Sequence, residues 1–135
     1  MLTQINLRDL MAAIKTRTEQ SGLPVYDRVP DNEESPLIYM QLVAQRPADT
    51  KTMYCSEYEV WLHVIAEETP SSVPMFGHIQ KVQEALTEDI TLPAQFELVL
   101  QANNGVQYTA VDPSGESHAV LSYIFIIAYG FKCKQ

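Results

Sequence analysis

One stretch of the chain, residues 119–131, is apolar at both of its alternating sets of positions, and Ser122 is its one polar residue. A strand buried on both faces has this pattern, whereas a half-exposed strand alternates with polar residues. The content of Ile, Val, Tyr and Phe favours a strand over a helix. The run is also shorter than the roughly 20 apolar residues that a membrane-spanning helix needs. We therefore expect a strand covered on both faces.

Two other stretches have the period of an amphipathic helix. Residues 3–20 begin at a cap residue, Thr3 or Asn6, and end at Gly22. Residues 73–88 follow a cap at Ser71 or Ser72. One apolar stripe is expected on each helix; the first contains Leu7, Leu10, Met11 and Ile14, and the second contains Val73, Phe76, Ile79, Val82 and Leu86.

Further strands are expected at residues 25–29, 37–44, 55–66 and 96–102. The polar connection 45–52 contains Pro47 and no glycine, so it predicts a longer projecting loop, residues 45–54, rather than a two-residue hairpin turn. Asn103, Asn104 and Gly105 form a turn signal before another apolar-rich run. The pattern leaves open whether this signal makes a hairpin or a bulge within one long strand.

The pattern as a whole predicts a single α+β domain over residues 1–135. The elements follow the order α-β-β-β-α-β-β. Strands joined by short loops favour a mostly antiparallel sheet of about four to five strands, with the two amphipathic helices packed on one face.

The amino-acid composition and charge exclude several classes of protein. Apolar residues make up 46% of the 135, charged residues 19%, and the net charge is −8. This is the composition of a globular protein, and an acidic chain without a run of Lys or Arg is not suited to coating DNA. Cys55 and Cys133 are far apart and form no CxxC pair, which argues against a disulfide framework or a zinc site and favours a reducing compartment. The N-terminus lacks a signal-peptide pattern, so cytoplasmic origin is the default.

The strand at 55–66 carries the candidate site. Tyr58, Val60, Leu62 and Val64 predict its core face, and the opposite face collects polar and aromatic residues; these are Cys55, Glu57, Glu59, Trp61 and His63. Carboxylates two residues apart on a strand lie roughly 6.5–7 Å apart, which could serve a metal or an acid–base pair. The alternatives are a subunit interface anchored by Trp61, or plain surface.

No sequence motif supports an enzyme or a cofactor site. The serines lack a GxSxG context, and the glycines lack GxGxxG or P-loop spacing. His78 and His118 have no partner at a fixed spacing and are interpreted as surface or cap residues.

A resemblance to a known family begins at VYDRVPDNEESPLIYMQL. The matching residues are Tyr26, Asp27, Val29, Pro30, Pro36 and Tyr39. The long strand YEVWLHVIAE, the helix end QEALTED and the segment SHAVLSYIFII extend the agreement over residues 24–128. Together they resemble small phage and prophage tail-completion proteins, also called tail terminator or head–tail joining proteins.

This resemblance implies a non-enzymatic virion component that is made in the host cytoplasm and needs no cofactor or membrane. Such proteins form a ring, often hexameric, that contacts the tail-tube protein and the head connector, and DNA passes through the ring without specific binding. The sheet edges and the polar face of strand 55–66, with Glu57, Glu59, Trp61 and His63, would supply the interfaces. The loop 45–54, with Arg46, Asp49 and Lys51, would reach a neighbouring ring or subunit. The alternative is a small-molecule-binding or other protein-interaction α+β domain.

Overall fold

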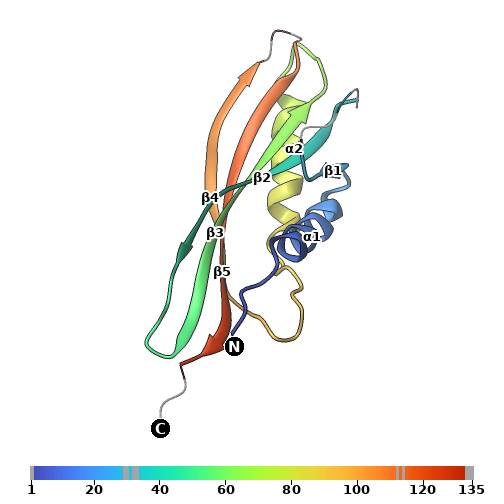
Figure 1. Cartoon of the computed structure of the whole chain (residues 1–135). Coiled ribbons are helices and arrows are strands. Elements are labelled where there is room, and N and C mark those ends of the chain that lie inside the picture. The colour runs from blue at the N-terminus through green and yellow to red at the C-terminus, as the bar shows by residue number, and fades with distance from the viewer. Residues whose placement is uncertain (1, 29–30, 32–33, 112, 114, 133–135) are drawn as a thin grey trace.

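The protein is a long, curved sheet with two helices packed against one of its faces (Figure 1). In the computed structural model, the described residues are 2–28, 31, 34–111, 113 and 115–132. Val29, Pro30 and Cys133, which the sequence analysis used, lie outside these ranges. The fold is α+β, and its elements follow the predicted order.

Five strands form one sheet in the spatial order β1-β2-β3-β5-β4. The strands are β1 (Val25–Tyr26), β2 (Leu37–Pro47), β3 (Met53–Ala66), β4 (Glu97–Val111) and β5 (Ser117–Phe131). The short β1 runs parallel to β2, and every other neighbouring pair is antiparallel. The mostly antiparallel sheet that the sequence predicts is therefore confirmed.

The first helix, α1 (Leu7–Thr18), starts later than predicted and continues into a short 3-10 turn, η1 (Glu19–Ser21). Of the two predicted caps, Asn6 is the one used: its side-chain Oδ1 accepts a hydrogen bond from the backbone N–H of Arg8. Gly22 follows with a φ of 89°, a left-handed conformation that ends the helical segment as expected. Leu10 and Ile14 are buried, whereas Leu7 is exposed.

The second helix, α2 (Val73–Ala85), has a different buried stripe from the one predicted. Val73 and Phe76 are 71% and 62% exposed. The residues that pack on the sheet side are Met75, Ile79, Val82 and Leu86, which keeps the helical period but shifts its start by two positions. The sequence pattern was ambiguous because Val73, Met75 and Phe76 are all apolar, and only packing against the sheet decides between them.

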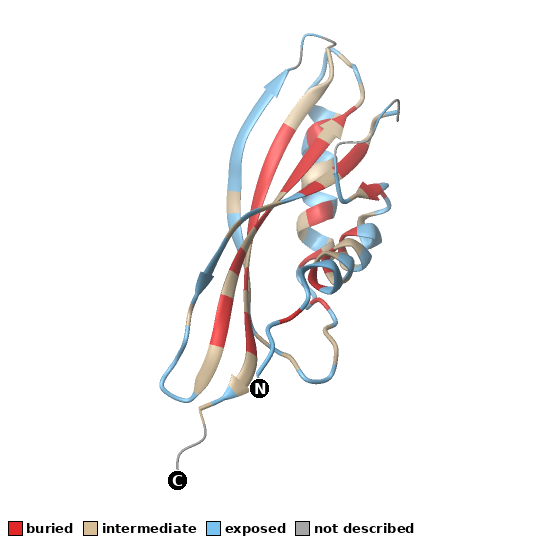
Figure 2. Ribbon diagram, viewed as in Figure 1, coloured by how far each residue is buried: buried red, intermediate tan, exposed pale blue. Residues whose placement is uncertain are grey.

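The core lies between the helices and one face of the sheet (Figure 2). Tyr58, Val60, Leu62 and Val64 of β3 are buried there, as the alternation predicts. Leu121, Tyr123, Phe125 and Ile127 of β5 lie in the same core cluster. On the other face of β5, Val120, Ser122 and Ala128 are buried and Ile124 and Ile126 are partly buried, so the expectation of a strand covered on both faces holds in part.

The β2–β3 connection is shorter than expected, and the turn signal at Asn103–Gly105 is now resolved. β2 continues through Gln45 and Arg46 to Pro47, paired with β3, so the connecting loop is only residues 48–52. The prediction of a loop from residue 45 is wrong because cross-strand pairing extends strand structure into a polar stretch. Asn103–Gly105 forms no hairpin: it is a register shift within the single long strand β4.

Candidate interface on the helix-free face of the sheet

The strand alternation of β3 brings Glu57, Glu59, Trp61 and His63 to the face of the sheet that carries no helix. Core residues occupy the positions between them, so these four side chains share one side. Arg46 joins them from β2, where it is the direct cross-strand partner of Glu57. Five of the seven predicted interface residues therefore lie on one surface.

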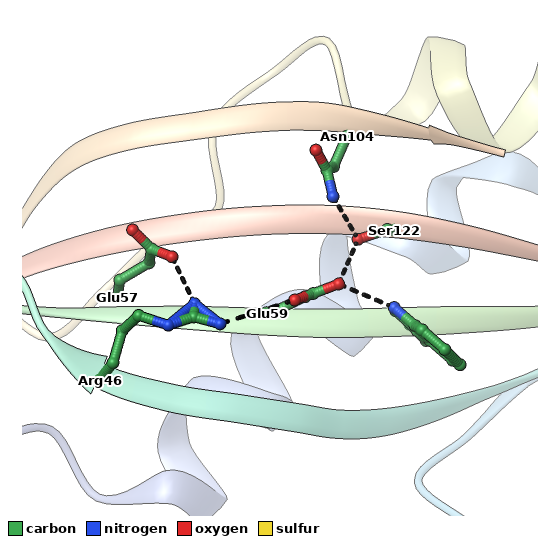
Figure 3. A network of polar contacts seen from close by, with 6 residues as sticks. Arg46, Glu57, Glu59, Asn104 and Ser122 are labelled. Atoms are coloured by element: carbon green, nitrogen blue, oxygen red, sulfur yellow. Dashed lines mark hydrogen bonds and ion pairs between the residues drawn. The ribbon is translucent and has the colours of Figure 1, made fainter. Parts of the chain in front are cut away.

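A chain of polar contacts crosses this face from β2 to β4 (Figure 3). The Arg46 guanidinium lies 2.6 Å from the Glu57 carboxylate and 3.8 Å from that of Glu59. Glu59 Oε2 also accepts hydrogen bonds from Trp61 Nε1 at 2.9 Å and from Ser122 Oγ at 3.0 Å. Asn104 Nδ2 donates to Ser122 Oγ at 3.1 Å. The contacts tie four neighbouring strands together through one carboxylate.

A second cluster surrounds His63, which is only 7% exposed. Its ring stacks on Tyr39 with centroids 4.3 Å apart and an interplanar angle of 4°. His63 Nε2 lies 2.8 Å from Gln41 Oε1, and His63 Nδ1 lies 3.0 Å from His118 Nε2. A neutral His63 that donates to Gln41 and accepts from His118 satisfies both contacts. Burial, with a smaller contribution from His118, lowers the pKa of His63 to about 4.

The remaining two predicted residues, Asp49 and Lys51, lie apart from this surface, in the loop between β2 and β3. Asp49 Oδ1 accepts a hydrogen bond from the backbone N–H of Cys55 at 2.9 Å, which fixes the loop onto the start of β3. Lys51 is exposed. Cys55 is buried rather than displayed, and burial followed by the charge of Asp49 raises the pKa of its thiol.

Sequence reasoning missed half of the partners on this face. Ser122, Asn104, Gln41 and His118 come from three other strands, and only the register between strands brings them together. A signal was present for Ser122, which is the one polar residue in the otherwise apolar run 119–131. His78, interpreted as a residue without a fixed partner, lies on α2 and contacts Glu67 at 2.9 Å. This contact lowers the pKa of Glu67.

The arrangement favours a rigid surface over a reactive centre. The Glu59 carboxylate is held by Trp61, Ser122 and Arg46. Among the described residues, no group of three or more His, Cys, Asp or Glu side chains is placed to hold a metal ion. In the same part of the chain, no helix is long and apolar enough to cross a membrane.

Comparison with known protein families identifies the family of this chain. Residues 1–135 match the family described as "Putative tail termination protein". The chain belongs to this phage tail terminator family. The resemblance seen in the sequence is thereby confirmed.

A solved structure shares the fold of this tail terminator protein. It is a chain from the "Virion of native gene transfer agent (GTA) particle", and the superposition has a TM-score of 0.68 with 19% sequence identity. The match covers 93% of this chain and 99% of that chain. Comparison with curated proteins gives no match. Family membership makes this chain a structural phage tail protein.

Proposed function

We propose that this tail terminator protein is a ring subunit that ends the growing tail tube and joins the tail to the head connector. The match to the tail termination family over residues 1–135 is the observation that carries the proposal. The role is structural and non-enzymatic, is performed in the virion, and follows assembly in the host cytoplasm.

The helix-free face is the proposed contact surface. It carries an aromatic anchor, Trp61, held in one orientation by its hydrogen bond to Glu59. Side chains that are already ordered lose little conformational entropy on binding, and tryptophan and arginine are enriched among residues that dominate binding energy. Trp61 and Arg46 are therefore expected to contribute most.

The ends of the molecule suit contacts along a tail axis. The β2–β3 loop, with Asp49 and Lys51, lies at one end of the sheet, and the end of β4 and the start of β5 lie at the other (Figure 1). A subunit of this shape would present one tip toward the tail tube and the other toward the connector. The net charge of −8 suits a ring through which DNA passes without binding.

The contact surface is tested by Trp61→Ala, with Phe76→Ala on α2 as the matched control. Both side chains are aromatic, and Phe76 lies on the helix side, 62% exposed. Loss of an aromatic anchor typically costs 2 kcal/mol or more, which is roughly a 30-fold weaker association. We expect Trp61→Ala to keep its fold and to lose ring assembly, measured by mass photometry and electron microscopy. If Phe76→Ala loses assembly and Trp61→Ala does not, the contact lies on the helix side.

The small-molecule alternative has a separate test. A cavity of about 380 Å³ lies between α1 and residues 91–93, on the helix side and away from the helix-free face. A ligand that binds the folded state raises the melting temperature. A metabolite screen that gives such a rise, abolished by Ala13→Trp in this cavity, would favour the alternative.

A further inference from the structure

We propose that the two open edges of the sheet pair with each other in neighbouring copies. The strand β4 of one copy would add to the second half of β2 in the next copy. This inference rests on the proposed ring and adds a backbone contact between neighbouring copies to the side-chain contact proposed for the helix-free face.

The edge strand β4 is long and poorly protected. It spans Glu97–Val111, pairs with β5 and with no other strand in the described part of the chain, and contains no Lys, Arg or Pro. Glu97 is its one charged residue, and its exposed large apolar residues are Val99, Leu100, Val106, Tyr108 and Val111. Exposed edges in soluble proteins are normally short or guarded by charges, prolines or bulges, because an open edge recruits other strands. Register shifts interrupt β4, yet Leu100–Asn103 pairs with β5 without a break.

The opposite edge of the sheet is open as well. Within the ranges that the structure describes, β1 pairs with β2 at Ile38 and Tyr39 alone. Beyond the register shift between Leu42 and Ala44, the regular stretch Ala44–Pro47 pairs with β3 on one side and with no described strand on the other. The exposed colouring of this half of β2 and of most of β4 is visible in Figure 2.

The two open stretches lie at the same height across the sheet. Leu100 pairs with Ile126, Ile126 with Glu57, and Glu57 with Arg46. The same steps connect Ala102 through Ile124 and Glu59 to Ala44. A copy generated by rotation about an axis parallel to the strands would thus bring Ala44–Arg46 beside Leu100–Ala102.

Strand direction and charge agree with a second copy as the occupant. The three pairings from β2 to β4 are all antiparallel, so β4 runs opposite to β2, and their union continues the antiparallel pattern. Arg46 is the one charged residue of β2, and Glu97 is the one charged residue of β4. At this register Glu97 lies within a few residues of the neighbour's Arg46. Two different edges that complement each other give a head-to-tail contact, and such contacts form a ring when the rotation between copies closes.

Cysteine cross-linking tests the register directly. Ala44→Cys and Ala102→Cys are combined in one chain with Cys133→Ser. Within a copy these positions are separated by β3 and β5, about 14 Å by strand spacing, so they cannot form an intrachain disulfide. We expect oxidation of the double variant on purified tails to give a ladder of covalent oligomers. Each single variant should give none.

An edge-blocking variant provides a second readout. Val99→Lys with Leu100→Lys places two charges on the β4 edge, beside the neighbour's Arg46. The matched control is Val73→Lys with Phe76→Lys on α2, where the side chains are also exposed. We expect the edge variant to need at least tenfold higher concentration for ring assembly and the control to assemble normally.

The results of these two experiments distinguish a failure of edge pairing from a failure of the proposed ring function. Rings that form without a cross-linked ladder, and that tolerate the lysines on β4, would overturn edge pairing and leave the ring intact. A chain that forms rings neither alone nor on tail tubes would overturn both.

Discussion

At the scale of single residues, the carboxylate of Glu59 accepts hydrogen bonds from Trp61 and Ser122 and lies within ion-pair distance of Arg46. Ser122 is fully buried, so removing its acceptor costs more than removing an exposed ion pair. We expect Glu59→Ala to lower the free energy of unfolding by about 1–3 kcal/mol. Glu57→Ala, which removes only a contact with Arg46, should cost less than about 1 kcal/mol. Equal losses in urea denaturation would contradict the central place of Glu59.

His63 gives the helix-free face a defined pH dependence. Its pKa is about 4 in the folded protein and near 6.5 when unfolded. Between these values the unfolded chain binds more protons, so the free energy of unfolding falls as the pH is lowered from 6.5 to 4. The full contribution, present above pH 6.5, is roughly 3 kcal/mol. His63→Phe keeps a ring against Tyr39 and does not titrate. Urea denaturation from pH 7.5 to 4 should therefore show a steeper loss in the wild type than in the variant, and equal slopes would refute this assignment.

Tyr123 carries a buried hydroxyl that has no hydrogen-bond partner among the described residues. Burial also raises the pKa of this side chain to about 12. Removing an unpartnered buried polar group is neutral or stabilising, so Tyr123→Phe should leave the free energy of unfolding unchanged or raise it by about 1 kcal/mol. The hydroxyl of Tyr58 is hydrogen-bonded to Ser56, so Tyr58→Phe should cost about 1 kcal/mol. A larger loss for Tyr123→Phe than for Tyr58→Phe in thermal or urea denaturation would contradict the assignment.

Residues of one strand were easier to predict than their partners. The alternation along β3 placed Glu57, Glu59, Trp61 and His63 on one face, because side-chain direction depends only on position within the strand. Their contacts with Ser122 and His118 depend on the register between strands that are about 60 residues apart in sequence. This separation is roughly the length of a whole small domain. A single sequence carries no signal for that register.

At the scale of elements, alanine substitutions of Gly77 and Gly105 are expected to change the free energy of unfolding in opposite directions. Gly77 lies within α2, and a Cβ there would meet no atom within 4 Å. Gly77→Ala should therefore raise the free energy of unfolding by about 0.5–1 kcal/mol through helix propensity. Gly105 has a φ of 97° at the register shift of β4. Gly105→Ala should cost about 1–2 kcal/mol because an L-residue is strained there. Thermal and urea denaturation of both variants test the pair, and a stabilising Gly105→Ala would contradict the assigned backbone.

The type of each element followed from the sequence, whereas its ends followed only where a cap residue marked them. The apolar run at 119–131 predicted β5, and the caps Asn6 and Gly22 predicted the limits of the first helical segment. Residues 45–47 were assigned to a loop because they are polar, yet pairing with β3 extends β2 through them. The buried stripe of α2 likewise depends on the sheet that it meets.

At the scale of the whole molecule, the helices cover one face of the sheet. Among the described residues, no helix covers the other face, and no strand pairs with the outer edge of β4 or of the second half of β2. The order of elements favoured this layering, since α+β folds place their helices on one face or at one end of an antiparallel sheet. The union of β3 with β5 in the middle of the sheet could not be predicted, because the intervening α2 and β4 allow several strand orders. The face, the edges and the two tips are the surfaces through which we propose that the ring, the tail tube and the connector meet.

Electron microscopy of tails made with and without this protein tests the proposed tail-terminating function most directly. With the protein present, we predict tails of uniform length that carry a ring at the head-proximal end and join to heads. Without it, we predict tubes of uncontrolled length or complete tails that fail to join. Normal, infectious particles made in its absence would contradict the proposal that this chain ends the tail and joins it to the head.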